Sequence, residues 1–210
     1  MTPEEYVEGR EGPLDLAGDG PETRSKRLLN LAFALLLLPL LVPLMAVIAI
    51  LIKLTSKGPA LYWSDRIGRN NTTFCMPKFR TMKMGTPPLA THLLSDAGLY
   101  VTPVGSLLRR TSLDELPQMF SVIAGHMNFV GPRPALFNQE DLVALRTERG
   151  VHRLVPGVTG WAQVNGRDEL PIPVKVEYDA EYLRRRSFSF DLKILLLTVI
   201  RVWRGEGVSH

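Results

Sequence analysis

Apolar side chains fill residues 28–52 almost without interruption, and no charged residue lies among them. A helix rises about 1.5 Å per residue, so about 20 apolar residues cross a hydrocarbon core roughly 30 Å thick. The run therefore predicts a membrane helix. Pro39 and Pro43 lie near its middle, and each removes a backbone donor and crowds the preceding turn. We therefore expect a kink or a break there.

Basic residues flank this run on both sides: Arg24, Lys26 and Arg27 before it, Lys53 and Lys57 after it. Basic residues beside a membrane segment favour the cytoplasmic side. A re-entrant helix, which dips into the bilayer and returns to the same face, satisfies both flanks. A straight crossing is the alternative, because spanning helices tolerate proline where neighbouring groups satisfy the backbone.

After this run the pattern changes to short apolar stretches separated by glycine, proline and polar residues. We expect strands at 60–63, 74–80 and near 160–164, a loop at 84–99, and helices at 104–110, 113–125, 138–149 and 173–185. The two prolines of 131–134 predict a rigid extended turn.

Residues 190–203 form the last apolar element, in which apolar residues recur at i, i+3 and i+4 with basic residues between them. The positions are Leu192, Leu195, Leu196, Val199, Ile200 and Trp203. This spacing predicts an amphipathic helix, which lies either in a membrane interface or on the protein core. The pattern leaves both open.

Composition divides the chain of 210 residues into parts. Residues 1–22 hold seven acidic side chains and one basic one, which leaves 24 basic and 14 acidic side chains in the rest. We expect an acidic flexible tail at 1–23, a re-entrant membrane segment of the form helix-break-helix at 24–55, and a basic cytosolic or interfacial catalytic domain at 56–210. The basic charge favours anionic partners: lipid headgroups, nucleotide phosphates or nucleic acid.

The motifs of several common enzyme classes are missing from the sequence. It has no GxxxxGK[ST], no HExxH and no strand-flanked GxGxxG, the usual signatures of P-loop nucleotide hydrolysis, zinc peptidase chemistry and dinucleotide binding. The lone Cys75 excludes an intramolecular disulfide and a cysteine-rich zinc site, and we expect it to be buried.

Two adjacent carboxylates, Asp114 and Glu115, are the first candidates for chemistry. The structural alternative is a capping box, in which Ser112 caps a helix and Glu115 reaches back to it. The functional interpretation makes Asp114 a nucleophile toward a phosphoryl group or a metal ligand, assisted by Glu115.

Cations near these carboxylates in the sequence favour the functional interpretation. Lys78 and Arg80 lie in one short block, Arg109 precedes the acidic pair, and Arg133 lies between two prolines. Arginine offers a planar fork to phosphate oxygens and lysine a point charge. Solvated surface is the alternative for each cation alone.

The segment 156–167 is rich in glycine and amide side chains. Its glycines permit close approach of the backbone to a ligand, Gln163 and Asn165 are suited to reading a base or sugar, and Trp161 to stacking. The alternative is a tight turn with a buried tryptophan.

In combination these segments resemble the monotopic phosphoglycosyl transferases, the bacterial sugar transferase family. The resemblance rests on the proline-containing helix and on four blocks in the family's order: 78–82, 112–116, 129–134 and 156–167. It implies an α/β fold, a small and mostly helical body with short strands. The anchors would be the N-terminal proline-broken re-entrant helix and interfacial amphipathic helices.

The family transfers a sugar 1-phosphate from a UDP-sugar to polyprenol phosphate, such as undecaprenyl phosphate, with Mg²⁺. The resemblance implies that Asp114 attacks the β-phosphate, releasing UMP and leaving a covalent phosphosugar, and that Asp114 and Glu115 hold the metal. Lys78, Arg80, Arg109 and Arg133 would hold phosphate oxygens. Gln163, Asn165 and Arg167 would contact nucleotide or sugar.

The resemblance also implies a location and partners. The protein would lie on the cytoplasmic face of the bacterial inner membrane, contact membrane lipids, initiate glycoconjugate assembly and feed downstream glycosyltransferases, without nucleic acid. Two departures stand out: Val42 precedes Pro43 where serine is common, and Asn30 stands where aspartate is frequent.

Two other functions are compatible with the residues. One is a non-catalytic, membrane-anchored module that binds anionic lipid or nucleic acid. The other is a transferase that binds both substrates together, with Asp114 acting only through Mg²⁺.

Overall fold

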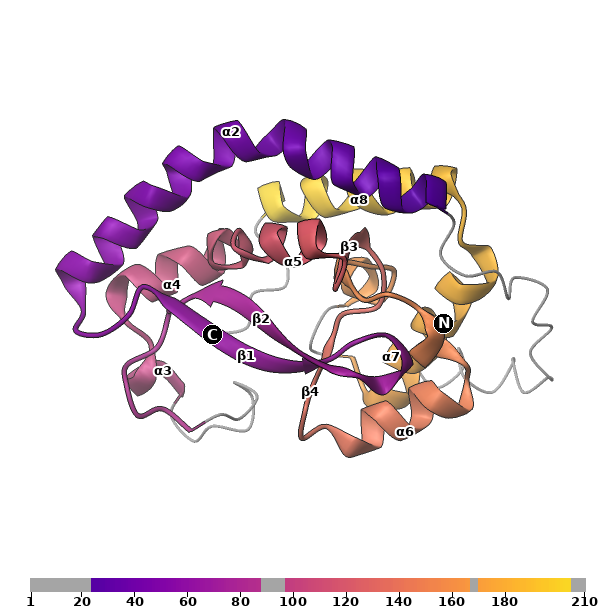
Figure 1. Cartoon of the computed structure of the whole chain (residues 1–210). Coiled ribbons are helices and arrows are strands. Elements are labelled where there is room, and N and C mark those ends of the chain that lie inside the picture. Colours follow the sequence, from indigo (N-terminus) through magenta and orange to yellow (C-terminus); the bar gives the residue numbers. More distant parts are fainter. Residues whose placement is uncertain (1–23, 88–96, 167–169, 205–210) are drawn as a thin grey trace.

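The computed structural model describes residues 24–87, 97–166 and 170–204. Figure 1 shows one long helix arching over a body of short helices and strands. The helices are α2 (Arg24–Thr55), α3 (Ala97–Tyr100), α4 (Pro103–Arg110), α5 (Gln118–Ala124), α6 (Glu140–Glu148), α7 (Ile172–Arg185) and α8 (Phe188–Arg204). The predicted acidic tail lies outside the described residues.

The predicted membrane helix is the single helix α2, which continues through both prolines instead of breaking into two halves. The helix curves (Figure 1), and Pro39 and Pro43, which cannot donate to the preceding turn, account for the bend. Its buried positions are Asn30, Ala34, Met45, Ile48 and Ile52, whereas most of its leucines are exposed. By length and composition the helix is able to cross a membrane.

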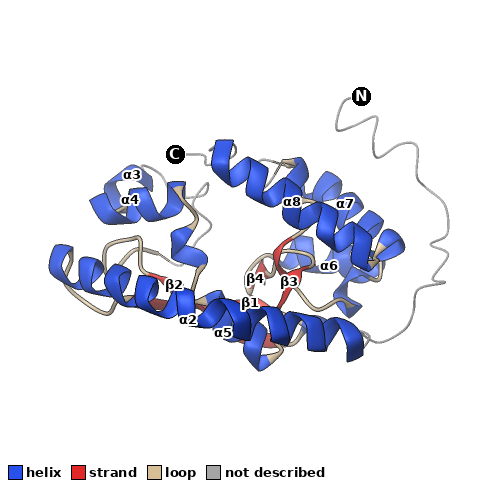
Figure 2. Ribbon diagram, turned by 90° about the horizontal axis from the view of Figure 1, so that it is seen from above, coloured by secondary structure: helices blue, strands red, loops and turns tan. Residues whose placement is uncertain are grey.

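The strands form two small sheets (Figure 2). In the first, β1 (Leu61–Ile67) pairs antiparallel with both β2 (Thr73–Phe79) and β4 (Ala135–Leu136). In the second, β3 (Asn128–Val130) runs parallel to β5 (Gly157–Thr159).

The two sheets are connected by the turn at 131–134, which follows β3 and precedes β4. No helix or strand is assigned to residues 131–134, in agreement with the predicted turn, and Gly131 lies in a bend. Within this turn Pro132 and Pro134 have no backbone N–H, so neither can donate to a strand ladder.

The described residues also form four short 3₁₀ turns: η1 (Arg69–Asn71), η3 (Leu113–Glu115), η4 (Val151–Arg153) and η5 (Gln163–Asn165). The predicted helix at 113–125 is divided into η3 and α5, because Pro117 between them lacks a donor. The strand predicted near 160–164 is wrong. Strand β5 ends at Thr159, and Val164 closes a turn by donating its N–H to the carbonyl of Gly160 at 3.1 Å.

The C-terminal half of α2 packs against the segment that carries Asp114 and Glu115. Met45, Ile48 and Ile52 form a core cluster with Phe79 and Leu108, and Leu113 and Leu116 pack against it. Leucines three residues apart lie on one side of a helical turn. Their burial therefore leaves the intervening Asp114 and Glu115 to face away from α2.

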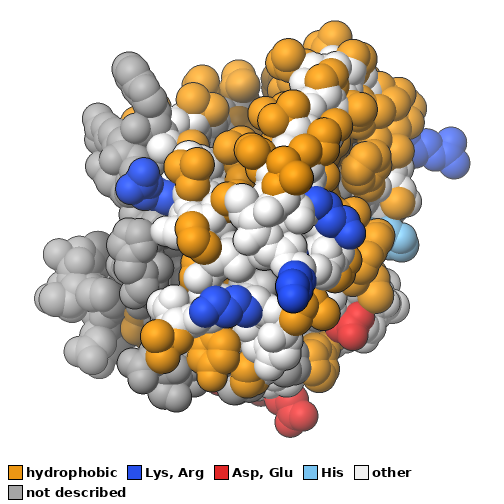
Figure 3. All heavy atoms as spheres, turned by 90° about the vertical axis from the view of Figure 1, so that its left-hand side faces the viewer, with side chains coloured by type: hydrophobic (Ala, Val, Ile, Leu, Met, Phe, Trp, Pro, Cys, Tyr) orange, Lys and Arg blue, Asp and Glu red, His pale blue; other side chains and the backbone are white. Residues whose placement is uncertain are grey.

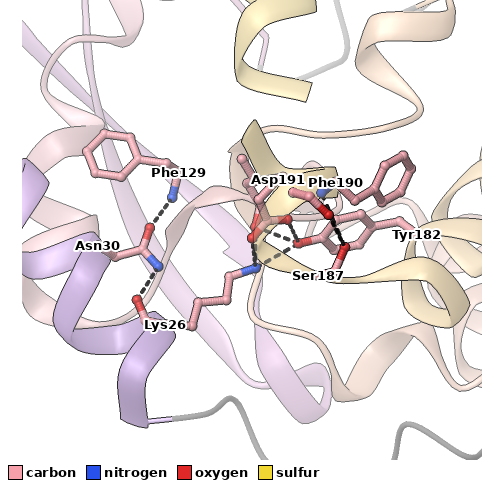
Figure 4. Close-up of polar contacts among 9 residues, drawn as sticks. Lys26, Asn30, Phe129, Tyr182, Ser187, Phe190 and Asp191 are labelled. Atoms are coloured by element: carbon pink, nitrogen blue, oxygen red, sulfur yellow. Dashed lines mark hydrogen bonds and ion pairs between the residues drawn. The ribbon is translucent and has the colours of Figure 1, made fainter. Parts of the chain in front are cut away.

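The first turns of α2 are attached to the body by polar contacts (Figure 4). The Asn30 amide uses both ends: Oδ1 accepts from the Phe129 N–H at 3.0 Å and Nδ2 donates to the Lys26 carbonyl at 2.8 Å. The Lys26 ammonium lies 2.8 Å from Asp191 of α8 and donates to the Tyr182 hydroxyl at 2.7 Å. An aspartate at position 30 would lack the amide donor, which explains how the asparagine fits here.

Candidate active site

Glu115 is the most strongly held carboxylate of the candidate site. Its Oε1 lies 3.1 Å from the Lys78 ammonium and 2.7 Å from Nη2 of Arg133. Lys78 lies on β2, Glu115 in η3 and Arg133 in the turn after β3. Three segments that are distant in the sequence therefore converge on one carboxylate.

The pKa of Glu115 records this arrangement. Burial raises the pKa, but the charges and hydrogen bonds of Arg133 and Lys78 outweigh burial and hold the Glu115 pKa well below its usual range. For Lys78, burial lowers the pKa and the Glu115 charge opposes that shift. Glu115 is thus an ionised, immobilised carboxylate at neutral pH.

The pKa of Asp114, the residue before Glu115, is shifted in the opposite direction. Burial and the neighbouring Glu115 charge raise its pKa, against the lowering effects of Lys78, Arg109 and Arg133. Among the described residues no hydrogen bond is made to its carboxylate. Asp114 is therefore free to react, and the cations around it are suited to receive a phosphate.

Arg109 supports the same side of the site from the end of α4. Its Nε donates to the Thr81 hydroxyl at 2.9 Å, and Thr81 is buried. Burial lowers the Arg109 pKa, and the nearby Asp114 charge opposes the shift. The structure thus brings together Asp114, Glu115, Lys78, Arg109 and Arg133.

The capping-box interpretation of this segment is wrong. Ser112 has a left-handed backbone (φ 57°) and no side-chain capping bond. The Glu115 side chain reaches to Lys78 and Arg133 instead of back to Ser112. The sequence motif looks like a cap, but its acidic residue points to cations from other elements.

Arg80 is not brought into this cluster. Its buried guanidinium donates to the carbonyls of Ser56 and Lys57 and to the Ser56 hydroxyl. These groups directly follow the end of α2, so Arg80 fixes the segment by which the chain leaves that helix. The short distance from Lys78 in the sequence conceals this different role.

The amide-rich segment has mixed placement. The Asn165 amide donates to the Trp161 carbonyl at 2.7 Å, and the Trp161 indole donates to Glu181 at 3.0 Å and packs in a core cluster. These contacts favour the turn alternative, with Trp161 partly buried against the core. Gln163 is buried, and neither of its amide atoms has a hydrogen-bond partner among the described residues. Arg167 lies outside the described residues.

Sequence reasoning missed Arg66 and Thr81. Arg66 of β1 contributes positive charge at Lys78, and Thr81 anchors Arg109. Pairing of a strand at 60–67 with 73–79 would have signalled Arg66, but only a shorter strand was expected. Cys75, expected to be buried, is exposed and donates to Asp65 at 3.0 Å.

The residues present fit a divalent cation. Within the described residues no three His, Cys, Asp or Glu side chains are grouped as a metal site, so the protein side is limited to the Asp114–Glu115 pair. Mg²⁺ is commonly held by one or two carboxylates together with substrate phosphates. Burial, and after it the Glu115 charge, raises the Asp114 pKa, and a bound cation would favour the ionised carboxylate.

Comparison with known proteins gives this site a family. The sequence model described as bacterial sugar transferase matches residues 21–205. The chain belongs to this family. Residues 21–205 include α2, every site residue described above and α8, so the family match and the site geometry concern the same part of the chain.

Individual relatives agree with the family. The UDP-glucose:undecaprenyl-phosphate glucose-1-phosphate transferase of Escherichia coli is 39% identical over 183 residues, covering 84% of this chain and 39% of the relative. The undecaprenyl-phosphate glucose phosphotransferase of Komagataeibacter xylinus is 42% identical over 187 residues, covering 84% and 35%. The exopolysaccharide production protein ExoY of Sinorhizobium fredii is 35% identical over 198 residues, covering 87% of each.

Relative length separates these proteins. The chain spans less than two fifths of the Escherichia coli and Komagataeibacter proteins but most of ExoY. The similarity to the two longer proteins is therefore limited to one part of each of them.

Proposed function

We propose that this protein transfers a sugar 1-phosphate from a UDP-sugar to undecaprenyl phosphate and releases UMP. The observation that carries the proposal is the half-buried Asp114, whose carboxylate receives no hydrogen bond from the described residues, beside a Glu115 fixed by Lys78 and Arg133. A reactive carboxylate within a ring of cations is suited to phosphoryl chemistry. The names of the Escherichia coli and Komagataeibacter relatives support the same substrate class.

The proposed reaction has two steps at Asp114. In the first, a carboxylate oxygen of Asp114 forms a bond to the β-phosphorus of the donor, and the bond from that phosphorus to the bridging oxygen breaks. UMP leaves with the bridging oxygen. In the second, a phosphate oxygen of undecaprenyl phosphate attacks the same phosphorus, and the Asp114 carboxylate is regenerated.

The other side chains act on charge and position. Arg109 and Arg133 are placed to receive phosphate oxygens near Asp114, while Lys78 and Arg133 keep Glu115 ionised and in place. Asp114 and Glu115 would hold Mg²⁺, which supplies neutralisation of the diphosphate charge when bound. Gln163, with its unsatisfied buried amide, is a candidate for a sugar or base contact.

The membrane side of the protein is proposed to be the side of α2 and α8. Figure 1 shows both helices on the upper side of the body, and Figure 2, seen from above, shows them along different edges. Exposed apolar residues continue along α8 as Leu192, Leu196, Val199 and Ile200. In Figure 3 apolar side chains gather toward the top and Lys and Arg lie below them, as expected beside anionic headgroups.

We further propose that α2 is re-entrant, with both ends on the cytoplasmic face of the inner membrane. The bend at the prolines and the packing of both halves of α2 on one body support this topology. Single cysteines near Arg24 and Lys57, in a Cys75→Ser background, test it by labelling in oriented vesicles. Labelling from the same side supports re-entry, and labelling from opposite sides contradicts it.

The function is tested by UMP release in nanodiscs that contain undecaprenyl phosphate, with Mg²⁺ and a panel of UDP-sugars beginning with UDP-glucose. We expect release that requires both substrates, formation of undecaprenyl diphosphate sugar, and loss of both in Asp114→Asn. A folded wild type that releases no UMP with any donor would favour a non-catalytic membrane module.

A further inference from the structure

The turn at 131–134 is held by its carbonyl oxygens. The Gly157 N–H donates to the Pro132 carbonyl at 2.9 Å, and Nη1 of Arg66 donates to the Pro134 carbonyl at 3.2 Å. Because both prolines lack an N–H, the carbonyls supply most of the backbone bonding available to this turn.

The middle carbonyl of the turn, that of Arg133, is bound by Arg146 of α6. Nη1 of Arg146 donates to it at 2.8 Å. Nε and Nη2 of the same guanidinium donate to Oδ2 of Asp179 on α7, at 3.0 and 2.6 Å. One rigid fork thus joins a buried carboxylate to the backbone of the residue that holds Glu115.

This ion pair is deeply buried, with the Arg146 and Asp179 side chains 9% and 1% exposed. Burial of a charge pair has a desolvation cost that its attraction often fails to exceed, so such a pair is weak evidence of a stabilising role. Burial also raises the Asp179 pKa, against the Arg146 charge, and Oδ1 of Asp179 has no hydrogen-bond partner among the described residues. The contact with Arg133 offers a more specific reason for the pair.

We propose that Arg146, held by Asp179, is a positioning residue of the active site: it fixes the Arg133 backbone and thereby directs the Arg133 guanidinium to Glu115. The consequence for catalysis rests on the proposed function. The step by which Arg146 orders the turn rests on the contacts alone.

A matched control lies on the same two helices. Arg149, which follows α6, pairs with the buried Glu177 of α7 at 2.5 Å. Like Arg146 it has a buried acidic partner on α7, although its own side chain is more exposed, 33% against 9%. Among the described residues Arg149 makes no hydrogen bond or ion pair with the turn at 131–134. Lysine at either position keeps a positive charge beside the carboxylate but cannot bridge two acceptors as the guanidinium does.

The experiment compares Arg146→Lys with Arg149→Lys at matched thermal stability. We expect Arg146→Lys to lower kcat of UMP release roughly tenfold with little change in KM, because displaced catalytic groups slow the chemical step. Arg149→Lys should change kcat less than about twofold. Equal effects of the two substitutions on kcat would overturn the inference.

Double substitution locates the effect. In an Arg133→Gln background, Arg146→Lys should lower kcat little further, since the contact that it positions is already lost. Full multiplication of the two losses would show that Arg146 acts elsewhere and would overturn the inference.

Hydrogen exchange supplies a readout that does not require turnover. The Arg133 and Ala135 amides, measured in a peptide covering 128–137, should exchange about tenfold faster in Arg146→Lys than in Arg149→Lys. Equal exchange contradicts the inference whether or not UMP is released. Faster exchange in a protein without UMP release would uphold the ordering of the turn and reject the proposed function.

Discussion

Asp114 and Glu115 are neighbours in the chain, yet the fold places them in opposite environments. Glu115 receives two cations at hydrogen-bond distance, whereas the Asp114 carboxylate receives no hydrogen bond from the described residues. As a result the Glu115 pKa is lowered and the Asp114 pKa is raised. Pairs of carboxylates whose pKa values are driven apart are typical of divided roles in catalysis.

The difference between the two carboxylates originates in the packing of η3, the turn that carries both of them. Leu113 and Leu116 pack, partly buried, against the core cluster that contains Met45, Ile48 and Ile52 of α2. The two carboxylates therefore lie on the other side, where β2 and the turn at 131–134 supply cations. Glu115 reaches those cations directly. Asp114 shares their field without being immobilised by them, as a nucleophile requires.

The largest expected effect is on turnover. Asp114→Asn removes the attacking oxygen and should lower the rate of UMP release by at least about 10³-fold, whereas Glu115→Gln retains the nucleophile and should lower it roughly 10²-fold. Single-turnover assays of both variants in nanodiscs measure the difference. If Glu115→Gln lost more activity than Asp114→Asn, Asp114 would not be the nucleophile.

Stability should respond to the same two substitutions with opposite signs. Glu115→Gln leaves Lys78 and Arg133 beside a neutral partner and should cost about 3 kcal/mol of unfolding free energy, as the breaking of a buried ion pair does. Asp114→Asn removes a carboxylate whose ionised form burial penalises, so it should raise the stability at pH 7. Chemical unfolding in one detergent without Mg²⁺ measures both, and loss of stability in both variants would reject the contrast.

Acidification should remove the difference in unfolding free energy between the wild type and each of these two variants, beginning at a different pH for each. The lowered Glu115 pKa contributes stability above the ordinary value of 4.5, and that contribution is lost as the pH falls further. The raised Asp114 pKa costs stability above the ordinary value of 3.8, and the cost is complete only above the raised pKa. As the pH falls, the stability advantage of Asp114→Asn should therefore begin to shrink at a higher pH than the loss of the Glu115 contribution. The test is unfolding of each variant and the wild type from pH 7 to pH 3, and simultaneous loss of the two differences would contradict it.

The smallest contrast concerns Lys78 and Arg80, which are two residues apart on one block. Lys78→Gln should lower UMP release roughly tenfold because it loosens Glu115. Arg80→Lys should leave turnover within about twofold and lower the melting temperature, because Arg80 binds carbonyls at the end of α2. An Arg80→Lys variant that folds normally but loses turnover would show that Arg80 acts in the active site.

Much of this architecture follows from local pattern. The apolar run predicted α2, proline and glycine predicted the turn at 131–134, and apolar periodicity predicted α8. These features depend on backbone chemistry and burial along one segment. At Pro39 and Pro43 the sequence predicted a kink or a break, and α2 bends there without breaking (Figure 1), because both of its halves pack against the body.

The site was harder to predict where the partners lie far apart in the sequence. Ser112 and Glu115 have the spacing of a cap, and only the convergence of Lys78 and Arg133 from other elements shows that Glu115 does something else. The same limit applies to Arg80 and Arg146, whose roles depend on carbonyls 24 and 13 residues away in the chain.

The central claim is that Asp114 forms a bond to the phosphosugar. Its most direct measurement is mass spectrometry of the protein after incubation with Mg²⁺ and an active UDP-sugar in membranes without undecaprenyl phosphate. We predict a peptide containing Asp114 that carries the sugar phosphate, disappears when the lipid acceptor is added, and is absent in Asp114→Asn. Rapid turnover with no adduct at this residue, in repeated quenched samples, would contradict the account and favour direct transfer between two bound substrates.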